Sequence, residues 1–390
     1  MITYLDHAAT SPLRPEVVEA MASARAEPLG NPTGSHRPAQ RARRLLEEAR
    51  DEVAELLGRL PAEIVFTSGG TESANLAVFG TLGAAKVSGD FAADGPVLLS
   101  SAIEHPAVRE SCRAAASTTG ALWAELPVLP SGVLDLDALS EAVDERTALV
   151  AVMAANNETG VIQPIASVVE TVRARNGDAA VFTDAVQAAT FADLSELVRG
   201  ADLVAVSAHK LGGPVGTGVL VVASSTTITP HQYGGGQERE RRSGTQDVVG
   251  AVGLATALRS AARDRSEIVT RVAALRDRLA EGLLSSVPDV HRTVPGGVPS
   301  LPGHLHLCFG GIEREELLVL LSESGVCASG GSSCASGALE WSYVLAAMGL
   351  DEGRARGALR FSLGHDTPGA DVQRALDVVP AAVASLRHGA

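Results

Sequence analysis

From about residue 60 to residue 225 the chain alternates short apolar runs with stretches in which apolar residues recur at helical spacing. The runs are rich in β-branched residues and show no polar alternation, which is typical of strands covered on both faces. The alternation of such strands with helices predicts parallel pairing. The predicted strands are 63–67, 96–100, 148–153, 180–183, 203–206 and 218–222, and the predicted covering helices are 106–116 and 165–175.

Helical spacing also marks the segments on either side of this region. Apolar residues recur at that spacing in 45–57 and in 268–283, and a long helix is expected to run through 250–286. The remainder, about 287–390, mixes strand and helix signals and starts with the Pro/Gly-rich stretch 293–302. The pattern predicts a large α/β domain and a smaller α+β C-terminal domain, with the hinge within or near the long helix.

Composition narrows the class of protein. The 390 residues are 45% hydrophobic and 20% charged, with 40 Gly and 19 Pro, as in a globular protein of about two domains. The net charge of −14 disfavours direct binding of nucleic acid or anionic lipid. The start of the chain does not resemble a signal peptide, and the longest apolar run, 148–155, is too short to span a membrane. Four cysteines are too few for a disulfide scaffold, so we expect a cytoplasmic enzyme.

A glycine-containing turn, 67–73, follows a predicted strand and opens a helix. Gly70 gives the backbone freedom to turn, and the Thr71 hydroxyl and the free N–H groups of the helix start could hold a phosphate. An ordinary capped strand-to-helix turn explains the same residues. The segment lacks the lysine of a Walker motif, so nucleoside triphosphate hydrolysis gains no support.

Three titratable residues follow predicted strands. Asp184 and Lys210 follow strands about one βαβ step apart, so both should project from the carboxyl edge of the sheet, and His105 follows another strand. A lysine that forms a Schiff base and an aspartate that pairs with a pyridinium nitrogen are what pyridoxal phosphate (PLP) chemistry requires. A loop lysine and a structural histidine are the simpler interpretations.

Two further features could carry chemistry. The Gly/Ser-rich stretch 325–340 contains Cys327 and Cys334, and a cysteine in such a setting can be reactive or merely a small buried residue. No Cys/His pair is spaced to complete a tetrahedral zinc site, so we expect no zinc there. Arg360 lies inside an apolar run, where capture of a carboxylate explains it better than a surface salt bridge.

These segments together resemble a cysteine desulfurase of the NifS/IscS type, within the class V aminotransferase-like PLP enzymes of fold type I. The resemblance runs nearly end to end, and the order and spacing of its motifs are highly specific. The matching segments are Tyr4–Thr10, Gly30–Pro32 with Ser35 and His36, Gly70–Ser73, Glu104–His105, Asn156–Glu158, Asp184 with Gln187, Ser207–Lys210, Gly234–Gly236, Arg242–Thr245 and Arg360–Gly364.

The resemblance implies a role for each candidate residue. Lys210 would bind PLP covalently and later move protons at the substrate carbon, Asp184 would keep the pyridine nitrogen protonated, and His105 would stack on the ring. The phosphate would be held by Gly70, Thr71, Ser207 and His209, and the ring oxygen would be contacted by Gln187 and Asn157, the latter also near the substrate. Arg360 would bind the carboxylate of L-cysteine, and Thr245 would reach the phosphate of the partner subunit in a homodimer.

Cys334 would attack the substrate sulfur as a thiolate, carry away a persulfide and leave alanine. The resemblance implies a large PLP-binding domain at 13–255 and a small domain of 1–12 and 256–390 that carries Arg360 and a mobile cysteine loop (about 324–338). The Arg-Ser-Gly-Thr segment and the Ser-Ser-Cys context favour the IscS-like over the SufS-like group. His7 and Gln237 depart from the usual family residues.

Some alternatives stay open. Cys-Ala-Ser-Gly occurs at both Cys327 and Cys334, and registration against the residues downstream favours Cys334. Selenocysteine lysis or another class V PLP reaction is the second enzymatic hypothesis, and a non-catalytic sulfur carrier or scaffold partner is a third. The sulfur acceptor is not defined: an iron–sulfur cluster scaffold, a tRNA thiolation enzyme, a carrier protein or a DNA phosphorothioation system would each fit, with nucleic acid reached only through a partner.

Overall fold

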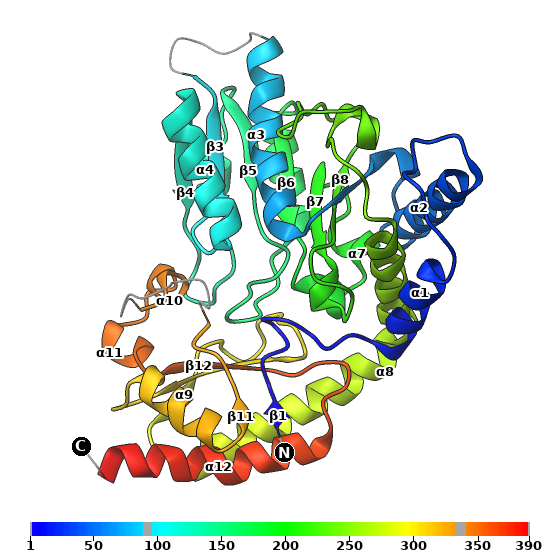
Figure 1. Ribbon diagram of the computed structural model, residues 1–390. Coiled ribbons are helices and arrows are strands. Elements are labelled where there is room, and N and C mark those ends of the chain that lie inside the picture. Colours follow the sequence, from blue (N-terminus) through cyan, green and yellow to red (C-terminus); the bar gives the residue numbers. More distant parts are fainter. Residues whose placement is uncertain (1, 89–94, 332–340, 389–390) are drawn as a thin grey trace.

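A computed structural model of the chain describes residues 2–88, 95–331 and 341–388. Its centre is a seven-stranded sheet with strand order β2-β8-β7-β6-β5-β3-β4, seen in the upper part of Figure 1. The strands are β2 (Ile64–Thr67), β3 (Val97–Ser101), β4 (Leu122–Leu126), β5 (Thr147–Ala151), β6 (Ala180–Asp184), β7 (Leu203–Ser207) and β8 (Gly218–Val222).

The predicted parallel pairing is confirmed from β3 to β7, but β8 is antiparallel to both of its neighbours, β7 and β2. Only a short connection with a single 3-10 turn, η3 (Ala208–Lys210), joins β7 to β8, and a connection of this length returns a strand antiparallel. The edge strand β4 escaped prediction because three of its five residues are exposed and it lacks a continuous apolar run.

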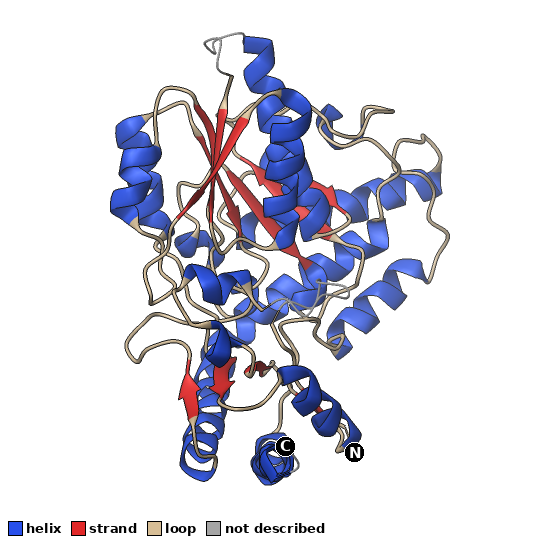
Figure 2. Cartoon of the chain, turned by 90° about the vertical axis from the view of Figure 1, so that its left-hand side faces the viewer, coloured by secondary structure: helices blue, strands red, loops and turns tan. Residues whose placement is uncertain are grey.

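Both faces of the sheet are covered, as the unalternating runs predict. Along most of its strands, successive side chains enter two different apolar cores, as Ile64 and Val65 of β2 do. Helices α3 and α4 supply apolar side chains to one core, whereas α2, α6 and α8 supply them to the other. Figure 2 shows helices on both sides of the twisted sheet. Because helices cover both faces, a site on this sheet can form only at the ends of its strands.

The predicted helices are present, with bounds that differ by a few residues. The long helix α8 passes residue 255 without a break, contacts α1 and α2 near the main sheet and contacts α12 at its other end (Figure 1). The helices are α1 (Pro15–Arg25), α2 (Arg37–Leu56), α3 (Gly70–Ser88), α4 (Pro106–Thr119), α5 (Leu136–Ala142), α6 (Ile165–Arg175), α7 (Leu194–Leu197), α8 (Val248–Ser286), α9 (Arg314–Glu323), α10 (Tyr343–Ala347), α11 (Glu352–Ala355) and α12 (Gly369–His388), with 3-10 turns η1 (Pro61–Glu63), η2 (Ala188–Thr190) and η4 (Gln237–Glu240).

Two small sheets lie below the main sheet in Figure 1. One is antiparallel, with order β12-β10-β9, and the other is a parallel pair of β1 and β11. The N-terminal strand therefore joins the C-terminal part of the chain. Their strands are β1 (Thr3–Tyr4), β9 (Val290–Arg292), β10 (His304–Phe309), β11 (Val326–Cys327) and β12 (Ala358–Ser362).

The smaller α+β unit predicted at the C-terminus is thus observed, and the exact boundaries 13–255, 1–12 and 256–390 stay a prediction. Among the described residues, no helix combines the length and the apolarity needed to cross a membrane.

Candidate active site

A cavity of about 290 Å³ lies where β6 and β7 end and where α3 and α4 begin. Ligands collect at the carboxyl ends of parallel strands because the connecting loops diverge there. Ten of the residues singled out from the sequence line this cavity, although they are spread over almost 300 positions of the chain. They are Gly70, Thr71, His105, Asn157, Asp184, Gln187, Ser207, His209, Lys210 and Arg360.

One end of the cavity is built for an anion. Helix α3 starts at Gly70, and the first N–H groups of a helix have no acceptor within it. The preceding Gly69 has a φ of +141°, and a Cβ at Gly70 would meet Val186 Cγ2 at 3.0 Å. His209 adds a neutral ring, because burial and the charge of Lys210 lower its pKa to about 4.

Asp184, the last residue of β6, provides a buried negative group. Its side chain is 7% exposed, and its Oδ1 accepts a hydrogen bond from Val186 N at 3.0 Å. Burial raises its pKa, while the hydrogen bond from Val186 N and the charge of Lys210 lower it. A buried carboxylate of this kind is stabilised by a cationic partner in the cavity.

His105 caps the start of α4. Its Nδ1 accepts a hydrogen bond from Ala107 N at 3.1 Å, so the proton of the neutral ring lies on Nε2. Burial lowers the pKa of His105, and Lys210 lowers it further against the opposing effect of Asp184. The ring therefore presents a neutral face to the cavity.

The amine of Lys210 lies against the N-terminal segment. Its Nζ donates to the carbonyl oxygens of Ala8 and Ala9 at 2.6 and 2.7 Å, and Gln187 Nε2 donates to the same Ala8 oxygen at 2.8 Å. Sequence reasoning missed this contact because backbone carbonyls of alanine leave no side-chain signal. The segment 4–10 was visible only as a family motif.

Arg360 is 2% exposed and extends from β12 into the cavity. Its Nη1 donates to the carbonyl oxygen of Asn157 at 2.8 Å, and its Nη2 donates to Asp6 Oδ1 at 2.6 Å. Its buried Nε finds no hydrogen-bond partner among the described residues, and neither does Asn157 Oδ1. A donor and an acceptor thus remain for a ligand. Asp6 lies in the matching segment Tyr4–Thr10, but its pairing with Arg360 escaped sequence reasoning because a separation of 354 residues gives no pattern.

Two buried carboxyls near the cavity also escaped sequence reasoning as functional residues. Glu104 Oε1 accepts from Ser101 Oγ at 2.6 Å and from Met153 N at 2.7 Å, and burial raises its pKa to about 8. Glu158, which lines the cavity, accepts a hydrogen bond from Ser342 Oγ at 2.6 Å, and burial raises its pKa. Both residues belong to motifs quoted from the sequence, but their raised pKa values could not be predicted because burial depends on the fold.

The residues present fit a PLP molecule. The helix start at Gly70 suits the phosphate, Asp184 suits a protonated pyridine nitrogen, and Lys210 supplies an amine. The unpartnered Asn157 Oδ1 and Arg360 Nε are buried polar atoms that a cofactor–substrate pair would satisfy.

Three predicted residues lie elsewhere. Thr245 is exposed and lines a shallow cavity with residues 25, 27–32 and 246–249, apart from the cavity that the ten candidates share. Cys327 is half-buried in β11, where its carbonyl oxygen accepts from Leu5 N at 3.0 Å. Cys334 falls within 332–340, outside the described residues.

Comparisons with known proteins identify the family. Residues 3–375 match the model of the aminotransferase class-V family. An IscS-like cysteine desulfurase of Mycobacterium tuberculosis is 42% identical over 391 residues, covering 100% of this chain and 98% of that protein.

Solved structures agree with this assignment. A NifS-like protein superposes with a TM-score of 0.89 at 36% identity, covering 99% of this chain and 100% of that one. SspA in complex with cysteine superposes with a TM-score of 0.78 at 29% identity, covering 92% of this chain and 98% of that one. The chain belongs to the class V aminotransferase family and, within it, to the IscS- and NifS-like cysteine desulfurases.

Proposed function

We propose that the protein is a PLP-dependent cysteine desulfurase, which converts L-cysteine to L-alanine and leaves the sulfur on the enzyme as a cysteine persulfide. The observation that carries this proposal is the convergence of Lys210, Asp184 and Arg360 on one cavity. A sulfur carrier without catalysis would have no need of such a cavity. The structural relative determined with bound cysteine supports the choice of substrate.

When bound, PLP supplies an electron sink that stabilises negative charge at the substrate carbon. Gly70, Thr71, Ser207 and His209 would hold its phosphate, and Gln187 and Asn157 would contact its ring oxygen. Asp184 would keep the ring nitrogen protonated, since its carboxylate is buried and favours a cationic partner. His105 would cover the ring with its neutral imidazole, and Lys210 would bind the cofactor and then transfer protons at the substrate carbon through Nζ.

Arg360 would bind the carboxylate of L-cysteine, using its remaining N–H groups in the paired geometry that guanidinium offers. The Cys334 thiolate would then attack the substrate sulfur. One S–S bond forms as the C–S bond of the substrate breaks, and a proton delivered to the carbon completes alanine. L-cysteine and the Cys334 thiolate thereby give L-alanine and the Cys334 persulfide anion, with no external oxidant or reductant.

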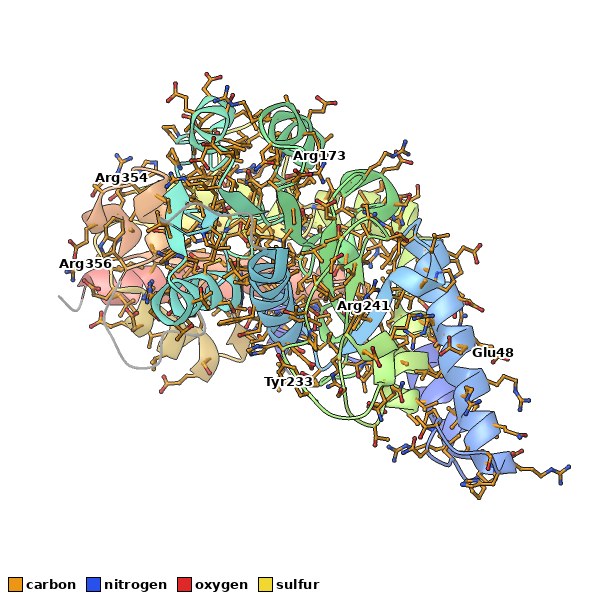
Figure 3. The ribbon with its side chains drawn as sticks, turned by 90° about the horizontal axis from the view of Figure 1, so that it is seen from above. Glu48, Arg173, Tyr233, Arg241, Arg354 and Arg356 are labelled. Carbon is orange, nitrogen blue, oxygen red and sulfur yellow. The ribbon has the colours of Figure 1, made fainter. Side chains whose placement is uncertain are left out.

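We further propose a homodimer in which Thr245 contributes to the site of the partner subunit. Thr245 is exposed and lies apart from the cavity of its own chain. Its segment is preceded by Tyr233, which is 81% exposed and lies at the outer edge of the molecule in Figure 3. A large aromatic side chain in that position is typical of an interface.

The persulfide would pass to a protein acceptor in the cytoplasm. An iron–sulfur cluster scaffold, a tRNA thiolation enzyme and a DNA phosphorothioation system remain alternatives for that acceptor. Capture of partners from a lysate by the native protein, followed by mass spectrometry, would show which of these acceptors binds the protein.

The purified protein, supplied with PLP and L-cysteine, should release alanine and hold persulfide sulfur. Cys334→Ala should abolish persulfide formation and leave PLP absorbance unchanged, and Cys327→Ala is the matched control with the same change elsewhere. Formation of pyruvate in place of alanine would contradict the proposal. Loss of persulfide in Cys327→Ala alone would assign the nucleophile to Cys327.

A further inference from the structure

A second cavity, of about 190 Å³, lies between a loop of the main sheet and the small antiparallel sheet. It is separate from the active-site cavity, although some residues that line one cavity lie next to residues that line the other. Thr159 lines it and directly follows Glu158, while His306 lines it and is the Cα partner of Arg360 in the β10–β12 ladder. Its lining residues are Thr159, Arg276, Arg292, Val294–Val298, Ser300 and His304–His306.

Two buried histidines of β10 form part of its wall. His304 is 6% exposed, and neither of its ring nitrogens finds a hydrogen-bond partner among the described residues. His306 is 3% exposed; its Nδ1 lies 2.7 Å from Thr293 Oγ1, whereas its Nε2 finds no partner in the same described ranges. Buried polar groups in proteins nearly always have a partner, so these nitrogens indicate that a ligand completes the cavity.

The charge of the cavity is positive. Arg276 of α8 and Arg292 of β9 line it, and none of its described lining residues is Asp or Glu. Asp277, just outside the lining, lies 2.7 Å from Arg276 Nε and 4.0 Å from Arg292 Nη2, so it neutralises one of the two charges. Burial, together with the positive charges of Arg360, Lys210 and Arg276, lowers the pKa of His304 to about 3.

These observations select the ligand class. A metal ion would be repelled by the two arginines, and the described residues contain no group of three or more His, Cys, Asp or Glu side chains that could hold one. An anion is attracted by both arginines and can accept from the histidine N–H groups. At about 30 Å³ per water molecule, the cavity has room for roughly six water molecules. A small oxyanion fits in that space.

We propose that this cavity binds a small oxyanion between Arg276 and Arg292 at its positively charged side and His304 and His306 at its buried side. The ligand is a compact group of the phosphate, sulfate or carboxylate type. The site is independent of the proposed desulfurase function, and its test does not use that activity.

The test is calorimetric titration of the PLP-saturated protein with sodium phosphate at constant ionic strength. Saturation with PLP fills the phosphate end of the active-site cavity, so that inorganic phosphate cannot bind there. The wild type should bind one phosphate per chain. Arg276→Gln should weaken this binding by about tenfold or more, because it removes a charge-assisted contact. Absence of saturable binding by the wild type would overturn the proposal.

Arg278→Gln is the matched control. Arg278 lies on α8 two positions away, is exposed and contacts Gln373, so its loss changes the net charge equally without touching the cavity. Its phosphate affinity should equal that of the wild type. Equal weakening in both variants would assign the effect to overall charge and overturn the site.

His304→Leu keeps a buried side chain and removes both ring nitrogens. Without phosphate it should unfold at the same temperature as the wild type or higher, because no described hydrogen bond of the ring is lost. It should bind phosphate at least about tenfold more weakly. Unchanged affinity in this folded variant would contradict the proposal.

Sulfate and acetate distinguish the possible sources of the oxyanion. Binding of phosphate and sulfate without acetate assigns the site to tetrahedral anions such as phosphate esters. Acetate binding of similar affinity extends the assignment to small carboxylates.

Discussion

Burial shifts the pKa values of His105, His209 and Glu104 in the directions that favour neutral side chains. Burial acts in the same direction on the carboxyls of Glu158 and Asp184, whose pKa values it raises. Glu104 is the clearest case, because its pKa rises to about 8 and its Oε1 accepts two hydrogen bonds.

A pH dependence of stability follows for Glu104. Its folded pKa lies above the unfolded value of 4.5, so its carboxyl stabilises the fold below pH 4.5 and loses this contribution as the pH rises to about 8. The free energy of unfolding should therefore fall with pH in that window, with a slope approaching about 1.4 kcal/mol per pH unit. Glu104→Gln imitates the protonated carboxyl and should remove this component of the slope.

Urea unfolding at a series of pH values measures the effect. Glu110→Gln, in which an exposed glutamate of α4 is changed, is the control and should behave like the wild type. An equal pH slope in the wild type and in Glu104→Gln would show that Glu104 is ionised in the folded protein.

Asp6 offers a second prediction for a single residue. Its Oδ1 accepts from Arg360 Nη2 at 2.6 Å and fixes the orientation of that guanidinium. Asp6→Asn removes the charge at nearly constant size, and we expect the KM for L-cysteine to rise by about tenfold with a smaller change in kcat. Steady-state kinetics measure both. A lower KM would show that Asp6 competes with the substrate for Arg360.

At the scale of elements, the turn η4 is anchored by a buried ion pair. Glu238 accepts from Arg50 Nη1 and Nη2 at 2.8 Å and from Phe66 N at 2.9 Å, which ties the turn to α2 and β2. Three successive residues, 238–240, have φ values of 47°, 56° and 63°, a left-handed conformation that is costly outside glycine. The ion pair therefore compensates for local backbone strain just before the segment that carries Thr245.

Glu238→Gln replaces the buried carboxylate with a neutral amide and leaves the half-exposed Glu47 as the carboxylate partner of Arg50. The free energy of unfolding should decrease by about 3 kcal/mol, the lower end of the range for removing one partner of a buried pair, because Glu47 still compensates part of the Arg50 charge. Urea unfolding measures this loss, and Glu240→Gln, which changes an exposed neighbour in the same turn, is the control. A loss of similar size in both variants would rule out the ion pair as its cause.

At the scale of the whole molecule, the proposed homodimer makes a prediction about complementation. Lys210→Ala lacks the lysine of its own site, and Thr245→Ala lacks the threonine given to the partner's site. A mixed dimer of the two contains one intact site, so random exchange of subunits in an equal mixture should restore about a quarter of the wild-type sites.

The measurement is alanine release by the co-refolded or co-expressed mixture against each variant alone. A mixture no more active than the sum of its parts would show that Thr245 serves the site of its own chain. A monomer in light scattering would contradict the dimer directly.

The sequence by itself determined the layered architecture and most of the chemistry. Unalternating apolar runs require a sheet covered on both faces, and residues that follow such runs must lie at one edge, which brought Asp184, Lys210 and His105 into one hypothesis. The reactive side chains, which are of distinctive type and lie in ordered motifs, could therefore be identified from the sequence alone. The antiparallel direction of β8 was not, because it depends on a short connection and not on the pattern within the strand.

Only the tertiary structure decided the contacts made across long separations and by the backbone. The carbonyl oxygens of Ala8 and Ala9 at Lys210, the pairing of Asp6 with Arg360 and the buried state of Glu104 depend on where the N-terminal segment and the strands pack. The cavity at His304 is likewise formed by β9, β10 and α8 together. Local pattern encodes which residues can react, whereas packing sets their charge state and their partners, because desolvation and proximity exist only once the chain has folded.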